Sequence, residues 1–427
     1  MRRLCLTALA TALLSPVNAW GQSGQLGPAR VEIGAQAIGI VTHESPAIHG
    51  RDLTEGYLTQ PMVMATVSFW NNAVEVIGAL DFEGVTLERG ELNAGIHGEG
   101  YVDRRHPHTY LHELVITAQR RFGLNGASVT IGKGFAPFGT DDPMARPFEK
   151  YPINHHLAQI LERAVAIGAL RTRRLILEGG LFNGDEPESA GDVPNRDRYW
   201  DSWSGRVTLI PFPQGELQTS YARVRSPENA RGGGTDQRKQ SASVRLEDAQ
   251  RSGYGLLEWA RTTNYAGSTR SFAFTSLLAE TWARYGSASG ALRFELTERP
   301  DEERQLDEFR AALPATDLSI LGRSRWTIIT ARVAASLSKK SVSLEPFAEV
   351  ARIRFAPTLK PSGFDPTQFY GSNRIWSITV GAKLTFGMDH MRMGRYGMAT
   401  NEERGMKMGD MHMHGAASSQ TTNTESR

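Results

Sequence analysis

Stretches in which apolar and polar residues alternate recur along the chain, and this pattern limits its fold more than any other feature. In residues 376–386 the apolar side chains occupy every second position, with Ser, Thr, Gly and Lys between them. Residues 127–132 and 292–297 show the same period. Because successive side chains of a β-strand point to opposite faces, this period indicates strands with one apolar and one polar face. The chain is therefore predicted to be all-β.

Sixteen such stretches are predicted as strands, at 30–42, 58–70, 73–84, 109–122, 125–138, 162–171, 173–184, 202–210, 215–226, 237–247, 252–263, 269–283, 287–300, 322–337, 341–356 and 373–386. Long connections follow most odd-numbered strands, at 43–57, 85–108, 139–161, 185–201, 227–236, 301–321 and 357–372, while 264–268 is short. Tight turns follow the even-numbered strands. Bacterial outer-membrane barrels have an even strand number, long external loops and short periplasmic turns. We therefore predict a transmembrane antiparallel β-barrel of about 16 strands with this asymmetry.

Aromatic residues support the same orientation. The sequence places Trp70, Phe122, Phe212, Tyr285 and Phe386 beside the predicted short turns. Aromatic rings favour the membrane interface, and barrels carry girdles of them at their rims. We expect these five side chains to mark the rim that carries the short turns.

Composition excludes several other classes of protein. Hydrophobic residues make up 40% of the chain, which suffices for a barrel in which only alternate strand residues meet lipid. Beyond residue 19 no apolar stretch reaches the roughly 18 residues of a membrane-spanning helix. A single cysteine excludes a disulfide scaffold and a cysteine-based zinc or iron–sulfur site. The formal charge of +2 argues against a nucleic-acid partner.

The N-terminus has the layout of a secretory signal peptide. Arg2 and Arg3 precede an apolar run at 4–14, and small residues lead up to Ala19. We predict a signal peptide at 1–19, a periplasmic lead at 20–29, a barrel at 30–386 and a Met/His-rich, flexible periplasmic tail at 387–427. Cleavage after Ala19 also removes Cys5, which leaves 46 basic against 46 acidic residues and no cysteine.

Three segments resemble known outer-membrane barrels. Residues 379–386, Thr-Val-Gly-Ala-Lys-Leu-Thr-Phe, resemble the closing-strand signal of such barrels. Residues 132–139, Gly-Lys-Gly-Phe-Ala-Pro-Phe-Gly, and 179–184, Gly-Gly-Leu-Phe-Asn-Gly, are similar to porins, in particular the phosphate-selective type. The resemblance implies a Gram-negative outer-membrane porin, a homotrimer with a water-filled lumen. The neutral charge balance departs from the basic ladder expected of a phosphate-selective pore.

Loop 139–161 is the third external loop in strand order, and in porins this loop commonly folds into the lumen. Rings and facing patches of charge set the selectivity of a pore. We predict that the acidic residues of the loop face a basic wall and that its two cations complete the constriction. The residues concerned are Asp141, Asp142, Arg146, Glu149 and Lys150 of the loop, with Arg293 and Lys383 of the wall. The alternative is an external cap held together by local salt bridges.

Histidines are distributed unevenly, with eight of the eleven between His43 and His156 and the other three in the C-terminal tail. Imidazole is the commonest metal ligand and suits zinc, copper and nickel. The candidate ligands are His106, His108, His112, His155 and His156. Arg104 and Arg105 lie beside them and disfavour a cation, so structural histidines remain the alternative.

Eight of the twelve methionines lie after Phe386, in a tail with too few aliphatic residues to form a core. Thioether and imidazole groups together are soft ligands that suit Cu(I). The candidate copper ligands of the tail are Met388, His390, Met391, Met393, Met406, Met408, Met411, His412, Met413 and His414. An extension without metal is the alternative.

These observations favour a porin of the bacterial outer membrane, through which small hydrophilic solutes or ions diffuse passively. A metal-handling outer-membrane protein that binds copper or zinc ions is the second candidate. A surface enzyme or adhesin is the third, and no catalytic residues are predicted because the chain has no GxSxG motif and no recognisable nucleophile with its base. The expected partners are outer-membrane lipid, lipopolysaccharide, the barrel-assembly machinery through the closing strand, and two further copies of the chain.

Overall fold

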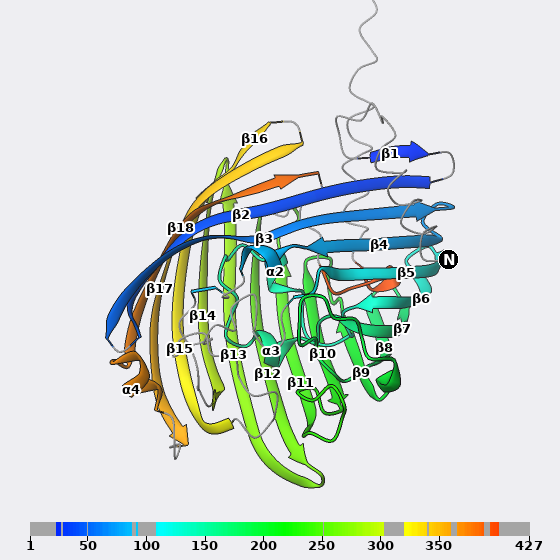
Figure 1. The fold of residues 1–427 in the computed structure, drawn as a ribbon. Coiled ribbons are helices and arrows are strands. Elements are labelled where there is room, and N and C mark those ends of the chain that lie inside the picture. Colours follow the sequence, from blue (N-terminus) through cyan, green and yellow to red (C-terminus); the bar gives the residue numbers. More distant parts are fainter. Residues whose placement is uncertain are drawn as a thin grey trace, which may run out of the picture.

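The computed structural model describes residues 23–26, 29–48, 50–87, 91–92, 108–250, 252–302, 320–339, 341–359, 365–387 and 393–400. The predicted signal peptide lies outside these residues. The described strands form one antiparallel sheet whose two edges meet, so that sixteen of them close into a barrel (Figure 1). The wall strands are β2 (Ala29–Ile48), β3 (Arg51–Phe69), β4 (Val74–Asp81), β5 (Leu111–Phe122), β6 (Asn125–Gly134), β7 (Arg163–Arg171), β8 (Leu175–Phe182), β9 (Ser202–Leu209), β10 (Gly215–Val224), β11 (Asp236–Glu247), β12 (Gly253–Ala266), β13 (Thr269–Tyr285), β14 (Ala288–Glu302), β15 (Ile320–Ala335), β17 (Val342–Leu359) and β18 (Arg374–Phe386).

The barrel is closed by β18, which pairs antiparallel with β2 from Phe386 opposite Ala35 to Trp376 opposite Ser45. Every other wall strand pairs with its neighbours in sequence. Two short strands lie outside the ring order: β1 (Ser23–Leu26) pairs with β2, and β16 (Leu337–Lys339) pairs with β17. Closure leaves no open edge in the wall. A sheet in lipid must have none, because lipid cannot form hydrogen bonds with free backbone groups.

The predicted barrel class is confirmed, and all sixteen predicted strands have a counterpart in the wall. The long connection predicted at 43–57 is wrong. There, β2 and β3 extend to 20 and 19 residues and only positions 49 and 50 separate them. Polar residues in this stretch, including Glu44 and Glu55, interrupt the alternation from which the strands are predicted. In the structure Glu44 lies opposite Leu53 and Glu55 opposite Thr42 in the paired strands.

Proline interrupts one strand pairing near the short-turn rim. Pro346 on β17 has no N–H to donate, and the strand opposite is divided at Ser336 into β15 and β16. The pairing of β17 with β18 passes Pro346 without a shift of register.

The wall has an apolar outer and a polar inner face. Along β6, Val129 and Ile131 are exposed on the outside while Ser128 and Thr130 are buried on the inside. The inner face of the other strands carries polar and charged side chains, among them Thr42, Glu75, Thr117, Glu178, Arg206, Glu258, Arg293, Thr330 and Thr379. The predicted aromatic residues Trp70, Phe122, Phe212, Tyr285 and Phe386 are all exposed. An apolar outer surface with exposed rim aromatics is that of a barrel in lipid.

Short helices occur in the connections at the long-loop end. They are α2 (Glu83–Thr86), α3 (His155–Ala158) and α4 (Pro366–Tyr370) (Figure 1). Among the described residues, no helix is long and apolar enough to cross a membrane.

The C-terminal tail differs from the expectation where the structure describes it. Residues 393–400, including the 3-10 turn η4 (Gly397–Ala399), lie against the inner faces of β5, β6, β7 and β8 (Figure 1). Tyr396, Met398 and Ala399 are buried there. This stretch is therefore a packed part of the barrel interior rather than a flexible periplasmic segment. The remaining tail, residues 388–392 and 401–427, lies outside the described residues.

The two-faced wall predicts how a charge on the outside would act. Val129 lies at the middle of β6 and is 60% exposed on the outer face. We expect Val129→Arg to lower the free energy of unfolding in lipid vesicles by about 2–4 kcal/mol, because the guanidinium would lie in hydrocarbon. Urea titration of the folded barrel measures this, with Val129→Leu as control. A loss no greater in Val129→Arg than in Val129→Leu would place this face away from lipid.

Candidate functional site

Loop 139–161 lies inside the barrel and touches the inner wall at several strands. Its first residue, Gly139, accepts hydrogen bonds through its carbonyl oxygen from Arg206 Nη1 at 3.1 Å and from Gln218. Farther along, the Ile153 N–H donates to Glu295 Oε2 at 2.9 Å and the Glu149 N–H donates to Glu349 Oε2 at 3.1 Å. These contacts reach β9, β10, β14 and β17, so the loop crosses the lumen.

Local sequence explains the path of the loop. Gly139 has a positive φ of 68°, and a Cβ there would lie 1.7 Å from the Ala158 carbonyl oxygen, so only glycine fits. Asp142 then caps the 3-10 turn η1 (Pro143–Ala145) by accepting a hydrogen bond from the Met144 N–H at 2.7 Å. Proline at the first position of this turn fixes φ at the value the turn needs.

Two charges of the loop that the sequence assigned to the constriction are buried in ion pairs. Asp141 lies 3.6 Å from Arg245 Nη1 on β11 and 3.3 Å from Arg395 Nε of the C-terminal segment. Arg146 lies 3.6 Å from Glu258 Oε2 on β12. The loop therefore meets the wall through pairs of opposite charge, contributed by both sides.

Two further predicted constriction residues, Lys150 and Arg293, also form ion pairs, but neither pair joins the loop to the wall. Lys150 forms an ion pair with Glu91 at 2.7 Å. On the wall, Arg293 bonds Glu295 at 3.0 Å and its guanidinium lies 4.5 Å from the centre of the Phe148 ring. Lys383 is half-buried on β18. The structure thus places acidic and basic groups on the loop and on the wall alike, instead of acids on one side and bases on the other.

One region of the loop concentrates acidic groups. Glu149 is buried beside Glu349 of β17, and Glu91 lies near both. Burial and these neighbouring carboxylates raise the pKa of Glu149 to about 8. Burial likewise raises the pKa of Glu91 to about 7, although Lys150 opposes the shift. Asp142 is also buried, and burial raises its pKa.

The C-terminal segment 393–400 fills part of the lumen next to the loop. Arg395 Nη2 donates to Gln218 Oε1 at 2.5 Å, and Arg395 is also paired with Asp141. The Tyr396 hydroxyl donates to Glu113 and accepts from the Phe135 N–H at 2.9 Å. These partners belong to the inner wall and to the loop, so the segment joins the two.

Arg206 holds both inserted segments to the wall. Its Nε and Nη2 donate to the two carboxylate oxygens of Glu178, each at 2.6 Å. The remaining donors reach the carbonyl oxygens of Gly139 and Gly394, each at 3.1 Å. Such a bidentate pair fixes the guanidinium plane, so one side chain of β9 positions the loop and the C-terminal segment together.

An apolar patch covers one side of the interior, where the sequence predicted a polar inner face throughout. It consists of Leu92, Trp326, Ile328, Ile353, Phe355, Phe369, Tyr370 and Ile375. Trp326 and Phe355 stack with ring centres 4.2 Å apart, and Tyr370 of α4 packs edge-on against both. The patch gives α4 and residue Leu92 an apolar surface to pack against, so these parts of the long connections stay inside the barrel.

Histidines 108, 112 and 155 meet in space, as the sequence suggested for a shared site. The rings of His108 and His112 lie 5.3 Å apart, and His155 of α3 lies 6.3 Å from His108. The ring of His156 lies 4.6 Å from that of His155. Met393 is partly buried against the apolar cluster that contains Phe135. Outside the described residues lie His106 and the tail residues Met388, His390, Met391, Met406, Met408, Met411, His412, Met413 and His414.

Carboxylates surround this histidine group. His108 Nδ1 lies 3.6 Å from Asp81 Oδ2 and 3.4 Å from Glu83 Oε2. Burial alone would lower the pKa of His108, but these two carboxylates outweigh it and raise the pKa well above its ordinary value. By contrast, burial and the neighbouring histidines lower the pKa of His155.

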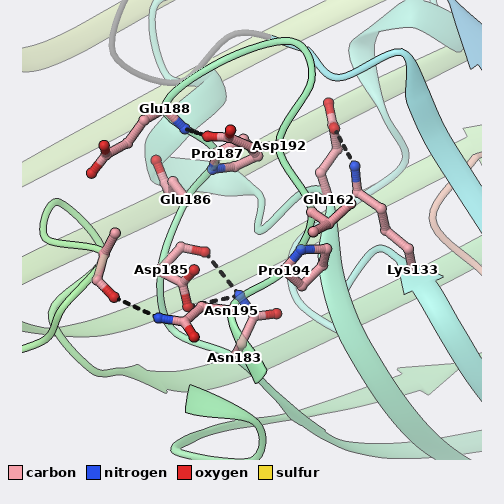
Figure 2. A pocket seen from close by; sticks show the side chains of 12 residues that line it. Lys133, Glu162, Asn183, Asp185, Glu186, Pro187, Glu188, Asp192, Pro194 and Asn195 are labelled. Carbon is pink, nitrogen blue, oxygen red and sulfur yellow. Dashed lines mark hydrogen bonds and ion pairs between the residues drawn. The ribbon is translucent and has the colours of Figure 1, made fainter. Parts of the chain in front are cut away.

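A cavity of about 100 Å³ adjoins the histidine group and is lined mostly by the connection between β8 and β9 (Figure 2). Acidic side chains dominate its lining, namely Glu162, Asp185, Glu186, Glu188 and Asp192. Lys133 lies 3.2 Å from Glu162 at its inner end. Of the other carboxylates, Glu186 is paired with Arg163 at 2.6 Å and Asp185 lies 3.9 Å from Arg198, so much of the negative charge is compensated.

Several of these site residues escaped the sequence-based prediction. Glu258 and Arg206 are buried charges on the inner face and Arg245 is a partly buried one, and a charge at an inward position of a predicted strand is the signal that marks them. Asp81 and Arg395 carry no comparable signal. Asp81 ends a strand and Arg395 lies in the tail, so only the folded chain brings them to the site.

Comparison with known proteins supports the fold. No family model and no curated protein matches the sequence. Among solved structures, the chain is similar to the anion-selective porin from Comamonas acidovorans, with 11% identity and a TM-score of 0.50 over 84% of this chain and 100% of that one. It is also similar to outer-membrane expressed OmpT of Vibrio cholerae, with 8% identity and a TM-score of 0.50 over 86% of this chain and 100% of that one.

The fold is therefore that of the outer-membrane porins, and the apolar outer surface places the barrel in the bacterial outer membrane. At this level of identity the likeness extends to the fold and not to a solute. The resemblance to the phosphate-selective type stays a prediction.

The raised pKa of Glu149 predicts a dependence of stability on pH. Between pH 4.5 and about 8 the folded chain holds a proton on Glu149 that the unfolded chain has released, so the free energy of unfolding falls as the pH rises through this range. We expect Glu149→Gln, which does not titrate, to make this fall smaller. Urea unfolding at a series of pH values measures it.

The matched control is Glu188→Gln, which removes an exposed carboxylate of the connection between β8 and β9. It should show the same fall as the unaltered chain. If the two variants behave alike, Glu149 is charged in the folded barrel at neutral pH and its burial is not maintained in solution.

Proposed function

We propose that the chain is a channel for the passive diffusion of small hydrophilic solutes or ions across the outer membrane, with loop 139–161 as its constriction. The observation that carries the proposal is the course of this loop, which crosses the interior and bonds to β9, β10, β14 and β17. A polar inner wall allows hydrated solutes to pass, and a loop across it limits their size.

The charge distribution supports weak rather than strong charge selectivity. The acidic and basic groups near the loop are arranged in pairs such as Asp141 with Arg245 and Lys150 with Glu91. A single-sign ring of charge, which would select cations or anions, is not formed by the described residues of the loop. The similar structure from Comamonas acidovorans is described as anion-selective, whereas the present chain has 48 basic and 46 acidic residues and so no large excess of positive charge.

The C-terminal segment 393–400 is proposed as a second element of the constriction. It lies against the wall beside the loop, and Arg395 pairs with Asp141 of the loop. Because Arg206 bonds to both Gly139 and Gly394, the loop and the segment narrow the lumen as one unit.

The other candidate functions are supported by fewer observations. The proposed copper-binding residues of the tail lie outside the described residues, apart from Met393. For a surface enzyme or adhesin, no arrangement of the described side chains favours the idea over a channel. A homotrimer, contact with lipopolysaccharide and insertion by the barrel-assembly machinery stay predictions from the sequence.

Two truncations test the channel and its constriction together. A chain without residues 388–427 loses the segment inside the barrel, whereas a chain without residues 401–427 keeps it. We expect the full chain to form channels in planar lipid bilayers and the shorter truncation to have the same single-channel conductance. The longer truncation should conduct better, because its lumen is wider.

Absence of conductance from all three proteins, each folded and inserted, would refute the channel. Equal conductance of the full chain and both truncations would show that segment 393–400 does not obstruct the passage. The closing residue Phe386 is kept in every protein, so the end of β18 is the same throughout.

A charge substitution tests the role of the loop. Asp141→Asn combined with Asp142→Asn removes two buried carboxylates and leaves Arg245 and Arg395 without their loop partner. We expect the preference for anions over cations to increase, as measured from the reversal potential in a salt gradient. Glu188→Asn with Asp192→Asn, in the connection between β8 and β9, serves as control. An unchanged reversal potential in the loop variant would exclude the loop from the constriction.

A further inference from the structure

We propose that Asp81, His108 and His112, together with Glu83, form a binding site for one divalent transition-metal ion inside the barrel. One donor atom from each of Asp81, His108 and His112 lies within 4.8 Å of the other two, and all three residues are buried. The free Oε2 of Glu83 is 3.4 Å from His108 and supplies a fourth donor. The site borders loop 139–161, since the ring of His155 lies 6.3 Å from that of His108. None of its four ligands belongs to the loop, so the site stands whether or not the lumen conducts.

The strongest sign of a missing ligand is the ring of His112. This side chain is 0% exposed, and its Nδ1 is 3.1 Å from Glu162 Oε1. A carboxylate only accepts, so Nδ1 carries the proton and Nε2 presents a lone pair. Nε2 has no hydrogen-bond partner among the described residues. A buried, unsatisfied lone pair is costly, and a metal ion would remove the cost.

Glu162, which orients the ring of His112, is itself fixed by hydrogen bonds. Its Oε2 accepts from the Thr109 N–H at 3.0 Å and from the Thr109 hydroxyl at 2.5 Å. Lys133 Nζ lies 3.2 Å from the same oxygen. A carboxylate that bonds the far nitrogen of a metal-binding histidine fixes the ring and strengthens the ligand. The pair of Glu162 and His112 has this arrangement.

Asp81 and Glu83 are each anchored by hydrogen bonds to one of their two carboxylate oxygens. Asp81 uses Oδ1 to accept from the Glu83 N–H at 2.8 Å. Glu83 uses Oε1 to accept from the Thr59 hydroxyl at 2.8 Å and the Gln60 N–H at 2.7 Å. The second oxygen of each, Asp81 Oδ2 and Glu83 Oε2, is buried without a hydrogen bond and lies near His108. Each carboxylate thus has one oxygen anchored and the other directed to a common centre.

Charge balance indicates a dication. Asp81, Glu83 and Glu162 contribute three negative charges, and Lys133, which is bonded to Glu162, contributes one positive charge. Metal binding requires both histidines to be neutral, and the group then has two negative charges that a divalent ion would neutralise. Without an ion, a proton on His108, which faces Asp81 and Glu83, supplies part of this compensation. Buried charges require such compensation.

The donor set selects the class of metal. Two imidazoles and two carboxylates suit zinc, nickel or cobalt, whereas calcium and magnesium prefer oxygen ligands alone and Cu(I) prefers sulfur. Zinc accepts four such ligands in a tetrahedron. Glu162, which bonds His112, also lines the cavity at the connection between β8 and β9 (Figure 2).

The test uses the full-length chain, folded in detergent and freed of metal with a chelator. Because the tail also contains histidines, the parent protein carries His390→Ala, His412→Ala and His414→Ala. We expect isothermal titration with zinc chloride to show one site per chain in this parent. Adding His112→Ala should weaken that site at least about tenfold, and adding Glu162→Gln should weaken it by about 10–100-fold through loss of the orienting bond.

His43→Ala is the matched control, since His43 bonds Thr54 on the neighbouring strand and lies outside the site. It should leave zinc binding unchanged. Each variant is first checked for folding by its mobility on an unheated detergent gel. Cobalt(II) gives a second measurement: the parent should show visible ligand-field bands of a four- or five-coordinate ion, and His108→Gln should lose them.

Two results would overturn the site. One is the absence of stoichiometric zinc binding in the folded parent. The other is zinc affinity and cobalt spectra in folded His112→Ala and His108→Gln that equal those of His43→Ala. If zinc does not bind but the chain conducts, the metal site is refuted and the channel proposal stands. If zinc binds but the chain does not conduct, the channel is refuted and the metal site stands.

Discussion

The whole structure depends on one constraint, that every backbone N–H and C=O within lipid must be bonded inside the protein. The pairing of β18 with β2 meets it by removing the last two sheet edges. Closure then separates the side chains of each strand into an outer and an inner set. The outer set must be apolar, while the inner set is free to be polar, and this freedom creates an interior in which charges and inserted segments are stable.

Within that interior, charges are balanced at short range. Arg146 with Glu258 and Asp141 with Arg245 join loop 139–161 to the wall. Lys150 with Glu91 joins the loop to the connection between β4 and β5, and Arg206 with Glu178 joins two wall strands. A buried pair of this kind adds little stability over an apolar contact, but removing one partner is costly. These pairs therefore determine where loop 139–161 lies more than they determine how stable the barrel is. The histidine and carboxylate group is balanced less completely, since among the described residues its three carboxylates face only Lys133 and the protonatable rings of His108 and His112.

The wall could be predicted from the sequence because each strand carries its own period-two pattern, as β18 does most clearly. The outer part of the β2–β3 hairpin is not predicted, because both of its faces carry polar residues there, such as His43 and the buried Glu44 of β2, and the alternation of apolar and polar residues fades. Loop 139–161 was placed by strand order alone, but its partners were not, because Arg245, Glu258 and Glu295 lie on distant strands. The insertion of residues 393–400 had no local signal: Tyr396 and Met398 become core residues only against a wall that is already built.

The position of residues 393–400 has a consequence for the order of assembly. These residues follow β18, the strand that closes the ring, and they pack on β5 to β8 and on the loop after β6. The surface they occupy is built from several strands, from β5 to β10, and none of these strands offers it alone. That surface must therefore form before the end of the chain can take its final place, so the interior is completed from both ends of the sequence.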